Sequence, residues 1–293
     1  MYRSTLTLII VLSQILICAT AFIFPKGNEF HRLSHIKLSQ PENADTIIAN
    51  PSNNGIPPTK QITGVIFDMD GTLIKPCIDF ADMRKRVYEI ADADTLLKDE
   101  PEGKRRGDVL ELYHYFSEEG KVLAKVVFDD IEVKALKNMQ LMEYVGDLTN
   151  FLDAKGIKRA VLTRNVKRSV DVMQDKLWNE YSAKEFFPAV NRETEGKYGP
   201  LPSKPSPEPI LHICNIWGCL PGNVIMVGDC AADDIVAASR AGCGGRVLLK
   251  YNGEILDNDS GGGDAINDAE REEREPSLVV TTLGELLQIL ERN

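Results

Sequence analysis

The sequence predicts an α/β fold: a doubly wound parallel sheet with a separate helical subdomain. Two observations carry this prediction. Apolar runs typical of buried strands alternate with helical patterns after residue 157, whereas residues 78–156 read as successive helices. The length of 293 residues and the hydrophobic content of 43% suit one large domain or a core with a smaller domain. The formal net charge of −10 argues against a general nucleic-acid binder.

The N-terminal region reads as a targeting sequence. An apolar run follows Arg3 and ends in a small-residue stretch up to Ala21, so we expect a signal peptide over residues 1–21. The alternative is an uncleaved membrane anchor. Residues 22–25 (FIFP) resemble the bipartite presequences of algae with secondary plastids, in which a phenylalanine follows the cleavage site. We therefore expect a transit peptide and disordered linker over residues 22–60 and a plastid location, with the secretory pathway as the alternative.

The α/β core is expected over residues 61–77 and 157–293. Its first strand, residues 64–67, is a short apolar run of the kind that buried parallel strands show. Between the last two strands, residues 252–276 are acidic and poor in apolar residues, which predicts a flexible surface insertion. After residue 157 the expected elements are strand 159–163, helix 166–178, the short extended stretch 186–190, helix 205–217, strand 223–229, helix 234–241, strand 245–250, strand 278–281 and helix 283–290.

The helical region, residues 78–156, is expected to be an inserted cap. Asp79 and Asp108 each precede a helical stripe of apolar residues and can cap the helix that follows. A third helix is expected over residues 122–136 and a fourth over residues 142–155, ended by a glycine. These amphipathic helices must pack on one another or on the core.

Polar residues follow several of the expected core strands or precede a core helix. Because chemistry in open α/β sheets lies beyond the carboxyl ends of the strands, these residues are candidates for one site. Each alone is also typical of an ordinary turn or cap. In chain order they are Asp68 and Asp70, Thr163, Lys204 before the helix expected from Pro205, and Asp229 followed by Asp233 and Asp234.

Taken in this order, the pattern resembles the haloacid dehalogenase-like hydrolase superfamily. The carrying features are D-x-D-G-T, a threonine after a strand, Lys-Pro, and Gly-Asp followed by a further acid; the resemblance covers about residues 64–250. It is closest to the phosphoglycolate phosphatase and β-phosphoglucomutase branch. The stretches LTRNV, KPSPEPILHICNIW and VGDCAADDI resemble a group of plant and algal members. The resemblance implies a Rossmann-like core with its helical cap over the active site.

The resemblance also implies roles for the candidate residues. Asp68 would be the nucleophile that forms an aspartyl-phosphate, and Asp70 would be the general acid and base. Thr163 would hold phosphoryl oxygens, and Lys204 would offset the charge of Asp68 and phosphate. Mg²⁺ would be bound by Asp68, the backbone carbonyl of Asp70 and Asp229.

The second acid of the last motif is either Asp233 or Asp234. In the family this acid is often followed by Ile-x-Ala and a helix, and residues 234–237 (DIVA) match that register. The match favours Asp234 as the further metal-site residue. Asp233 would then be a helix-capping carboxylate.

The function implied is an Mg²⁺-dependent phosphatase that acts on a small phosphorylated metabolite. The alternatives are a phosphomutase, which shares Asp68 and Asp70, and a non-catalytic binding protein on the same fold. Dehalogenases of the superfamily lack an acid at the second position, so Asp70 favours phosphate chemistry. We expect no nucleic-acid partner, no membrane association of the mature form, and a monomer.

Overall fold

The computed structural model describes residues 55–251 and 268–293. The signal peptide expected over residues 1–21 lies outside the described residues. So do residues 22–54 of the expected transit peptide and linker, and residues 252–267 of the acidic segment. The end of that segment forms helix α9 (Asp268–Glu273), which has no buried residue. Within the described ranges, no helix is both long enough and apolar enough to cross a membrane.

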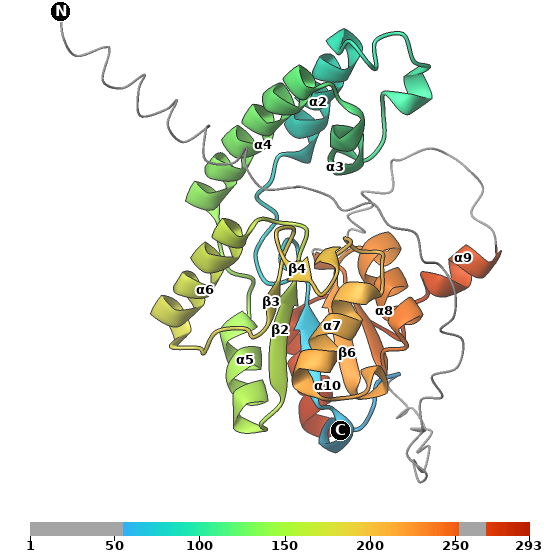
Figure 1. Cartoon of the computed structure of the whole chain (residues 1–293). Helices are drawn as coiled ribbons and strands as arrows, with labels where there is room; N and C mark the ends of the chain where they lie inside the picture. Colours follow the sequence, from blue (N-terminus) through green and yellow to red (C-terminus); the bar gives the residue numbers. More distant parts are fainter. Residues whose placement is uncertain (1–54, 252–267) are drawn as a thin grey trace, which may run out of the picture. The chain divides into compact units, whose positions relative to one another are not determined.

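The described residues contain a six-stranded sheet in the order β3-β2-β1-β6-β7-β8, which confirms the predicted α/β core (Figure 1). Every neighbouring pair in it is parallel. Among the described strands, β1 therefore lies between β2 and β6. The strands are β1 (Gly64–Phe67), β2 (Lys158–Leu162), β3 (Ala189–Val190), β6 (Val224–Gly228), β7 (Gly245–Leu249) and β8 (Leu278–Val280); β4 (Glu195–Gly196) and β5 (Gly199–Pro200) form a separate antiparallel pair.

Helices cover both faces of this sheet. In β1, Val65 and Phe67 belong to one apolar cluster and Ile66 to another, because successive side chains of a strand point to opposite faces. The first cluster also contains buried residues of α5 (Val145–Ala154), α6 (Lys167–Tyr181) and α10 (Leu283–Arg292). The second contains those of α7 (Glu208–Trp217) and α8 (Val236–Ala241).

A third apolar cluster holds α2 (Phe80–Ala93), α3 (Val109–Leu112) and the first part of α4 (Glu118–Asn138) together (Figure 1). As expected, Asp79 and Asp108 cap the first two of these helices: Asp79 accepts from the backbone of Asp82, and Asp108 accepts from the amides of Leu110 and Glu111. The second helix is shorter than expected, because it ends after one turn and continues as the 3₁₀ turn Tyr113–Tyr115.

The packing differs from the expected boundary at residue 156. The helix expected over residues 142–155 was assigned to the cap, yet Val145, Leu148 and Leu152 of α5 lie in the cluster of the sheet. The helix begins only at Val145, after Tyr144 in the left-handed region (φ 63°). The physical reason is that an amphipathic helix can pack on a sheet as well as on other cap helices, and the apolar stripe of α5 faces β2 and α10.

Another predicted helix start was also wrong. The helix expected from residue 205 begins at Glu208, because the preceding residues form a turn in which the amide of Ser206 donates to the carbonyl of Ser203 at 3.0 Å. Lys204 therefore lies in that turn rather than at the helix start. The helix expected from residue 234 is preceded by a π-helical turn, Ala231–Ile235, and α8 proper begins at Val236.

Candidate active site

The chain turns sharply where β1 ends. The amide of Asp68 still donates to the carbonyl of Val227 at 2.9 Å, so this residue continues the sheet, and its side chain is buried. The turn that follows contains Gly71 with φ +75°, a left-handed conformation that favours glycine. A side chain at Gly71 would also overlap the Asp229 carboxylate. The glycine therefore lets the end of β6 approach the end of β1.

Three carboxylates converge at this edge of the sheet. Asp68, Asp229 and Asp234 each offer an oxygen, and these oxygens all lie within 4.8 Å of one another. Lys204 reaches the same point: its buried Nζ contacts Asp234 at 2.6 Å and also contacts Asp68. The turn before α7 thus brings an ammonium group to the ends of β1 and β6.

The cluster carries more negative than positive charge. Burial, together with the charges of Asp68 and Asp234, raises the pKa of Asp229 to about 9. Burial likewise raises the pKa of Asp68, although the neighbouring Lys204 opposes this. A bound divalent cation would keep all three carboxylates ionised, and a donor set made only of oxygen suits Mg²⁺. The residues present therefore fit the metal that the family resemblance implies.

Asp70 sits in a different environment from Asp68. Asn165 donates from its side-chain amide to Oδ2 of Asp70, whereas Oδ1 is buried and no described residue donates to it. Burial raises the pKa of Asp70 to about 6, while the Asn165 hydrogen bond and the Lys204 charge oppose the rise and the Glu132 charge adds to it. A carboxyl with such a pKa can hold or release a proton near neutral pH.

Thr163 lies directly beyond the end of β2. Its amide donates to the carbonyl of Val190 at 3.0 Å, and its hydroxyl oxygen accepts from the amide of Asn165 at 3.1 Å. Because β2 is the neighbour of β1, with Val161 opposite Phe67, Thr163 lies at the same sheet edge as Asp68. The hydroxyl group still has its own hydrogen to donate to a ligand.

The geometry distinguishes the two acids of the last motif. Asp234 is buried in the cluster, and its Oδ2 accepts from the amide of Cys230 at 3.1 Å. Asp233 is not a helix cap, contrary to the expectation. Its carboxylate accepts instead from the Arg164 guanidinium at 3.2 Å, which holds it away from the Asp68 cluster.

Arg164 also connects the cap to the sheet. Its second terminal nitrogen donates to Asp108, the N-cap of α3, at 2.6 Å. The Asp108 pKa is lowered: burial would raise it, but the Arg164 charge and its hydrogen bonds outweigh burial. This guanidinium therefore links the start of a cap helix to the loop that carries Asp233.

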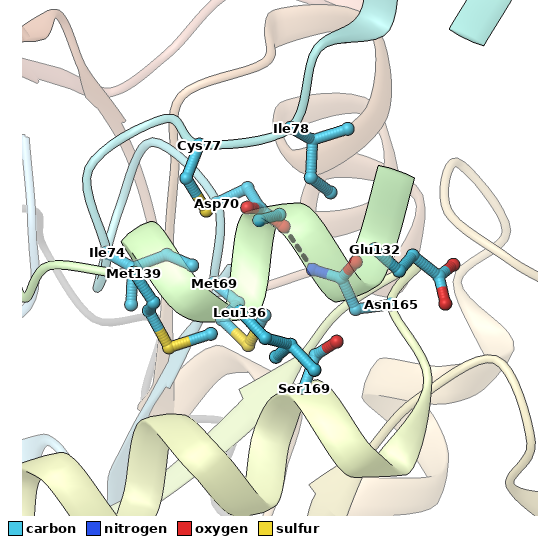
Figure 2. A pocket seen from close by; sticks show the side chains of 11 residues that line it. Met69, Asp70, Ile74, Cys77, Ile78, Glu132, Leu136, Met139, Asn165 and Ser169 are labelled. Carbon is cyan, nitrogen blue, oxygen red and sulfur yellow. Dashed lines mark hydrogen bonds between the residues drawn. The ribbon is translucent and has the colours of Figure 1, made fainter. Parts of the chain in front are cut away.

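Figure 2 shows a cavity that borders Asp70. Its walls come from the β1 turn, from α4 and from the start of α6. Glu132 of α4 is only 9% exposed and pairs with Arg192 at 2.8 Å. The lining residues are Met69, Asp70, Ile74, Cys77, Ile78, Glu132, Ala135, Leu136, Met139, Asn165 and Ser169.

Two residues of this site, Asn165 and Glu132, were not predicted as site residues. For Asn165 a signal existed in the sequence, because it follows Thr163 by two residues in a loop after a strand. For Glu132 none existed: it is one of many acidic residues on a helix, and only the packing of α4 turns it toward the sheet. The structure brings the predicted Asp68, Asp70, Thr163, Lys204, Asp229 and Asp234 to one edge of the sheet.

The sequence of this chain is similar to those of known proteins. A family model described as haloacid dehalogenase-like hydrolase matches residues 62–242. A haloacid dehalogenase-like hydrolase domain-containing protein of Arabidopsis thaliana is 36% identical over 182 residues, which span 62% of this chain and 69% of that protein. A phosphoglycolate phosphatase of Pasteurella multocida is 29% identical over 204 residues, 60% of this chain and 81% of that protein.

A solved structure extends the likeness to the fold. The β-phosphoglucomutase of Clostridium difficile is 20% identical, with a TM-score of 0.51, and the alignment covers 79% of this chain and 96% of that one. Since the family model matches more than half of the 293 residues, this chain belongs to the haloacid dehalogenase-like hydrolase family.

Proposed function

We propose that the protein is an Mg²⁺-dependent phosphatase of small phosphomonoesters. The observation that carries the proposal is the contrast between two neighbouring carboxyls. Asp68 is buried against the Lys204 ammonium and close to Asp229 and Asp234, whereas Asp70 is outside that cluster, accepts from Asn165 at Oδ2 and keeps a buried Oδ1 to which no described residue donates. One group is therefore suited to nucleophilic attack, and the other to moving a proton.

In the proposed reaction, a carboxylate oxygen of Asp68 forms a bond to phosphorus as the bond from phosphorus to the leaving oxygen breaks. Asp70 gives its proton to that oxygen. It then takes a proton from the water that attacks the aspartyl-phosphate, which regenerates Asp68 and releases phosphate. The electron pairs and protons balance with water as the only co-reactant.

Other residues would hold the reacting groups in position. Thr163 donates its hydroxyl to a phosphoryl oxygen, and Lys204 offsets the charge gathered on Asp68 and the phosphate. Asn165 fixes the orientation of the Asp70 carboxyl through Oδ2. When bound by Asp68, Asp229 and Asp234, Mg²⁺ supplies positive charge that neutralises the phosphoryl oxygens.

The test is hydrolysis of para-nitrophenyl phosphate by the purified protein, with Mg²⁺ and with EDTA. We expect Mg²⁺-dependent phosphate release that Asp68→Asn lowers by about 10⁴-fold or more, the scale of losing a nucleophile. Asp171→Asn, the same change on an exposed helix face, is the control and should keep full activity. No turnover of this or any other phosphomonoester by the folded protein would contradict the proposal.

The alternative phosphomutase activity shares the attack by Asp68 but returns the phosphoryl group to the substrate. Assays with sugar phosphates separate the two, since a phosphatase releases inorganic phosphate and a mutase yields an isomeric sugar phosphate. We further propose that the protein acts as a monomer on a small phosphorylated metabolite without a nucleic-acid partner. Size-exclusion chromatography with light scattering tests the oligomeric state.

We also propose delivery to a plastid through a signal peptide over residues 1–21 and a transit segment up to residue 60. The support is the sequence alone, in which FIFP follows the small-residue stretch that ends at Ala21. A fluorescent protein fused to residues 1–60 should enter plastids of an alga with secondary plastids. Retention of this fusion in the secretory pathway would contradict the proposal.

A further inference from the structure

The cap helices and the sheet have separate apolar cores. The cluster of α2, α3 and the first part of α4 shares no described member with the clusters of the sheet. Directional polar contacts are therefore needed to fix how these helices are held on the sheet. Within residues 55–251 and 268–293, two ion pairs join them to it: Asp108 with Arg164 at 2.6 Å, and Glu132 with Arg192 at 2.8 Å.

Both arginines follow strands of the sheet. Arg164 comes directly after Thr163, beyond the end of β2, and Arg192 is the second residue after β3. Because the parallel strands β1, β2 and β3 end at one edge of the sheet, both guanidinium groups come from the edge that carries the candidate active site. The cap is therefore attached at the edge where Asp68 and Asp70 lie.

Arg164 is held from two sides. One terminal nitrogen donates to Asp233 at 3.2 Å, in the turn just before Asp234, and the other donates to Asp108 at 2.6 Å. The side chains of Arg164, Asp108 and Asp233 are 29%, 35% and 26% exposed, so solvent screens their charges less than those of a fully exposed pair. A planar guanidinium makes both contacts in a fixed geometry, whereas a lysine offers one flexible point charge. One side chain thus ties the N-cap of α3 to the loop that precedes Asp234.

We propose that Arg164 is a positioning residue: its ion pair with Asp108 holds the cap helices over the catalytic edge of the sheet. The inference rests on the function proposed above. The position of the cap affects the chemistry because α4 supplies Glu132 and Leu136 to the lining of the cavity that borders Asp70. A shift of the cap would change the surroundings of that carboxyl, and a misplacement of about 1 Å can cost about a hundredfold in rate.

The test replaces the N-cap aspartates of two cap helices in turn. Asp108→Asn keeps a good N-cap for α3 but removes the charge that Arg164 holds. Asp79→Asn makes the same change at α2, where the carboxylate accepts from Asp82 and contacts no described residue of the sheet, so it is the matched control. We expect Asp108→Asn to lower kcat/KM for para-nitrophenyl phosphate by about ten- to a hundredfold, and Asp79→Asn to leave it unchanged.

Two further measurements separate positioning from a general loss of stability. In a double-mutant cycle, Arg164→Met combined with Asp108→Asn should lower kcat/KM no further than Arg164→Met alone, because both changes remove the same contact. Hydrogen exchange in the loop 163–166, to which the cap is tied, should be faster in Asp108→Asn than in wild type and unchanged in Asp79→Asn. Urea unfolding establishes that each variant is folded under the assay conditions.

Three outcomes would overturn the inference: equal kcat/KM in Asp108→Asn and wild type, additive losses in the cycle, or unchanged hydrogen exchange in the loop 163–166. If Arg164→Met does not fold, the comparison of Asp108→Asn with Asp79→Asn decides alone. Absence of turnover by the wild-type protein is failure of the proposed function. Hydrogen exchange needs no turnover, so it still decides whether the ion pair holds the cap on the sheet.

Discussion

Replacing Lys204 by methionine removes an ammonium group from a buried cluster of carboxylates. The side chain of Lys204 is 3% exposed and contacts both Asp68 and Asp234. For the 2.6 Å contact with Asp234, Coulomb's law gives about 6 kcal/mol at an effective dielectric constant of about 20. The variant no longer has to desolvate an ammonium group, which offsets part of this loss.

The expected net effect on the free energy of unfolding is a loss of about 3–5 kcal/mol, as when one partner of a buried ion pair is removed. Urea denaturation at pH 7 in EDTA measures it. Lys167→Met is the control, because Lys167 is 68% exposed and its pair with Asp171 should contribute about 0.5 kcal/mol at most. Added Mg²⁺ should restore part of the stability of Lys204→Met, since it supplies positive charge to the same carboxylates.

A loss below about 1 kcal/mol in EDTA would refute this reasoning, because it would mean that the carboxylates are neutral or solvated without Lys204. An equal gain from Mg²⁺ in a variant that lacks Asp229 would refute the metal part of it. Circular dichroism before denaturation establishes that each variant starts from the folded state.

Three further predictions follow from other parts of the structure. Gly71→Ala should lower the free energy of unfolding by about 1–2 kcal/mol, because it places an alanine in the left-handed conformation. It should also raise the Mg²⁺ concentration needed for activity, because the new methyl group overlaps Asp229. The control is Gly156→Ala, which has a similar φ of +69° but open space around it and should show only the loss of stability. Asp94→Asn should cost about 1–3 kcal/mol at pH 7, because the carboxylate accepts three hydrogen bonds from Leu96 and Ser117. Burial would raise the Asp94 pKa, but these hydrogen bonds lower it below the unfolded value of 3.8. The stability that the Asp94 carboxylate contributes is therefore present above pH 3.8 and is lost as the pH falls through the lower folded pKa. In urea unfolding from pH 7 to 3, the difference in stability between the wild type and Asp94→Asn should shrink. Dialysis against EDTA should abolish phosphate release and added Mg²⁺ should restore it, whereas activity that survives EDTA would contradict a metal-dependent reaction.

The sheet was predictable because its central strands, β1 and β6, are buried on both faces. A run such as Val224–Gly228 must be apolar throughout, and few other structures need such a run between polar turns. The start of α7 was less predictable, since Pro205, Pro207 and Pro209 lack amide hydrogens and suit both a first helical turn and the turn before it. The partner of α5 was also undetermined, because an apolar stripe does not say which surface it will cover.

Some residues of the candidate site were likewise predictable from the sequence, and others were not. Asp68, Asp70 and Asp229 follow strands, so the topology of a parallel sheet brings them together wherever the helices lie. Glu132 reaches the cavity only because of the rotation of α4 about its axis, and Arg164 meets Asp108 across 56 residues of chain. Such contacts depend on tertiary packing, which neither spacing nor periodicity encodes.

The apolar cluster that holds α2, α3 and the first part of α4 has, among the described residues, no member in common with the clusters of the sheet. Substitutions in separate clusters have nearly independent effects on stability. After a gene duplication, one copy could therefore exchange apolar residues of this cap cluster without first repairing its sheet, whereas Asp68 and Lys204, at the sheet edge, would stay under constraint.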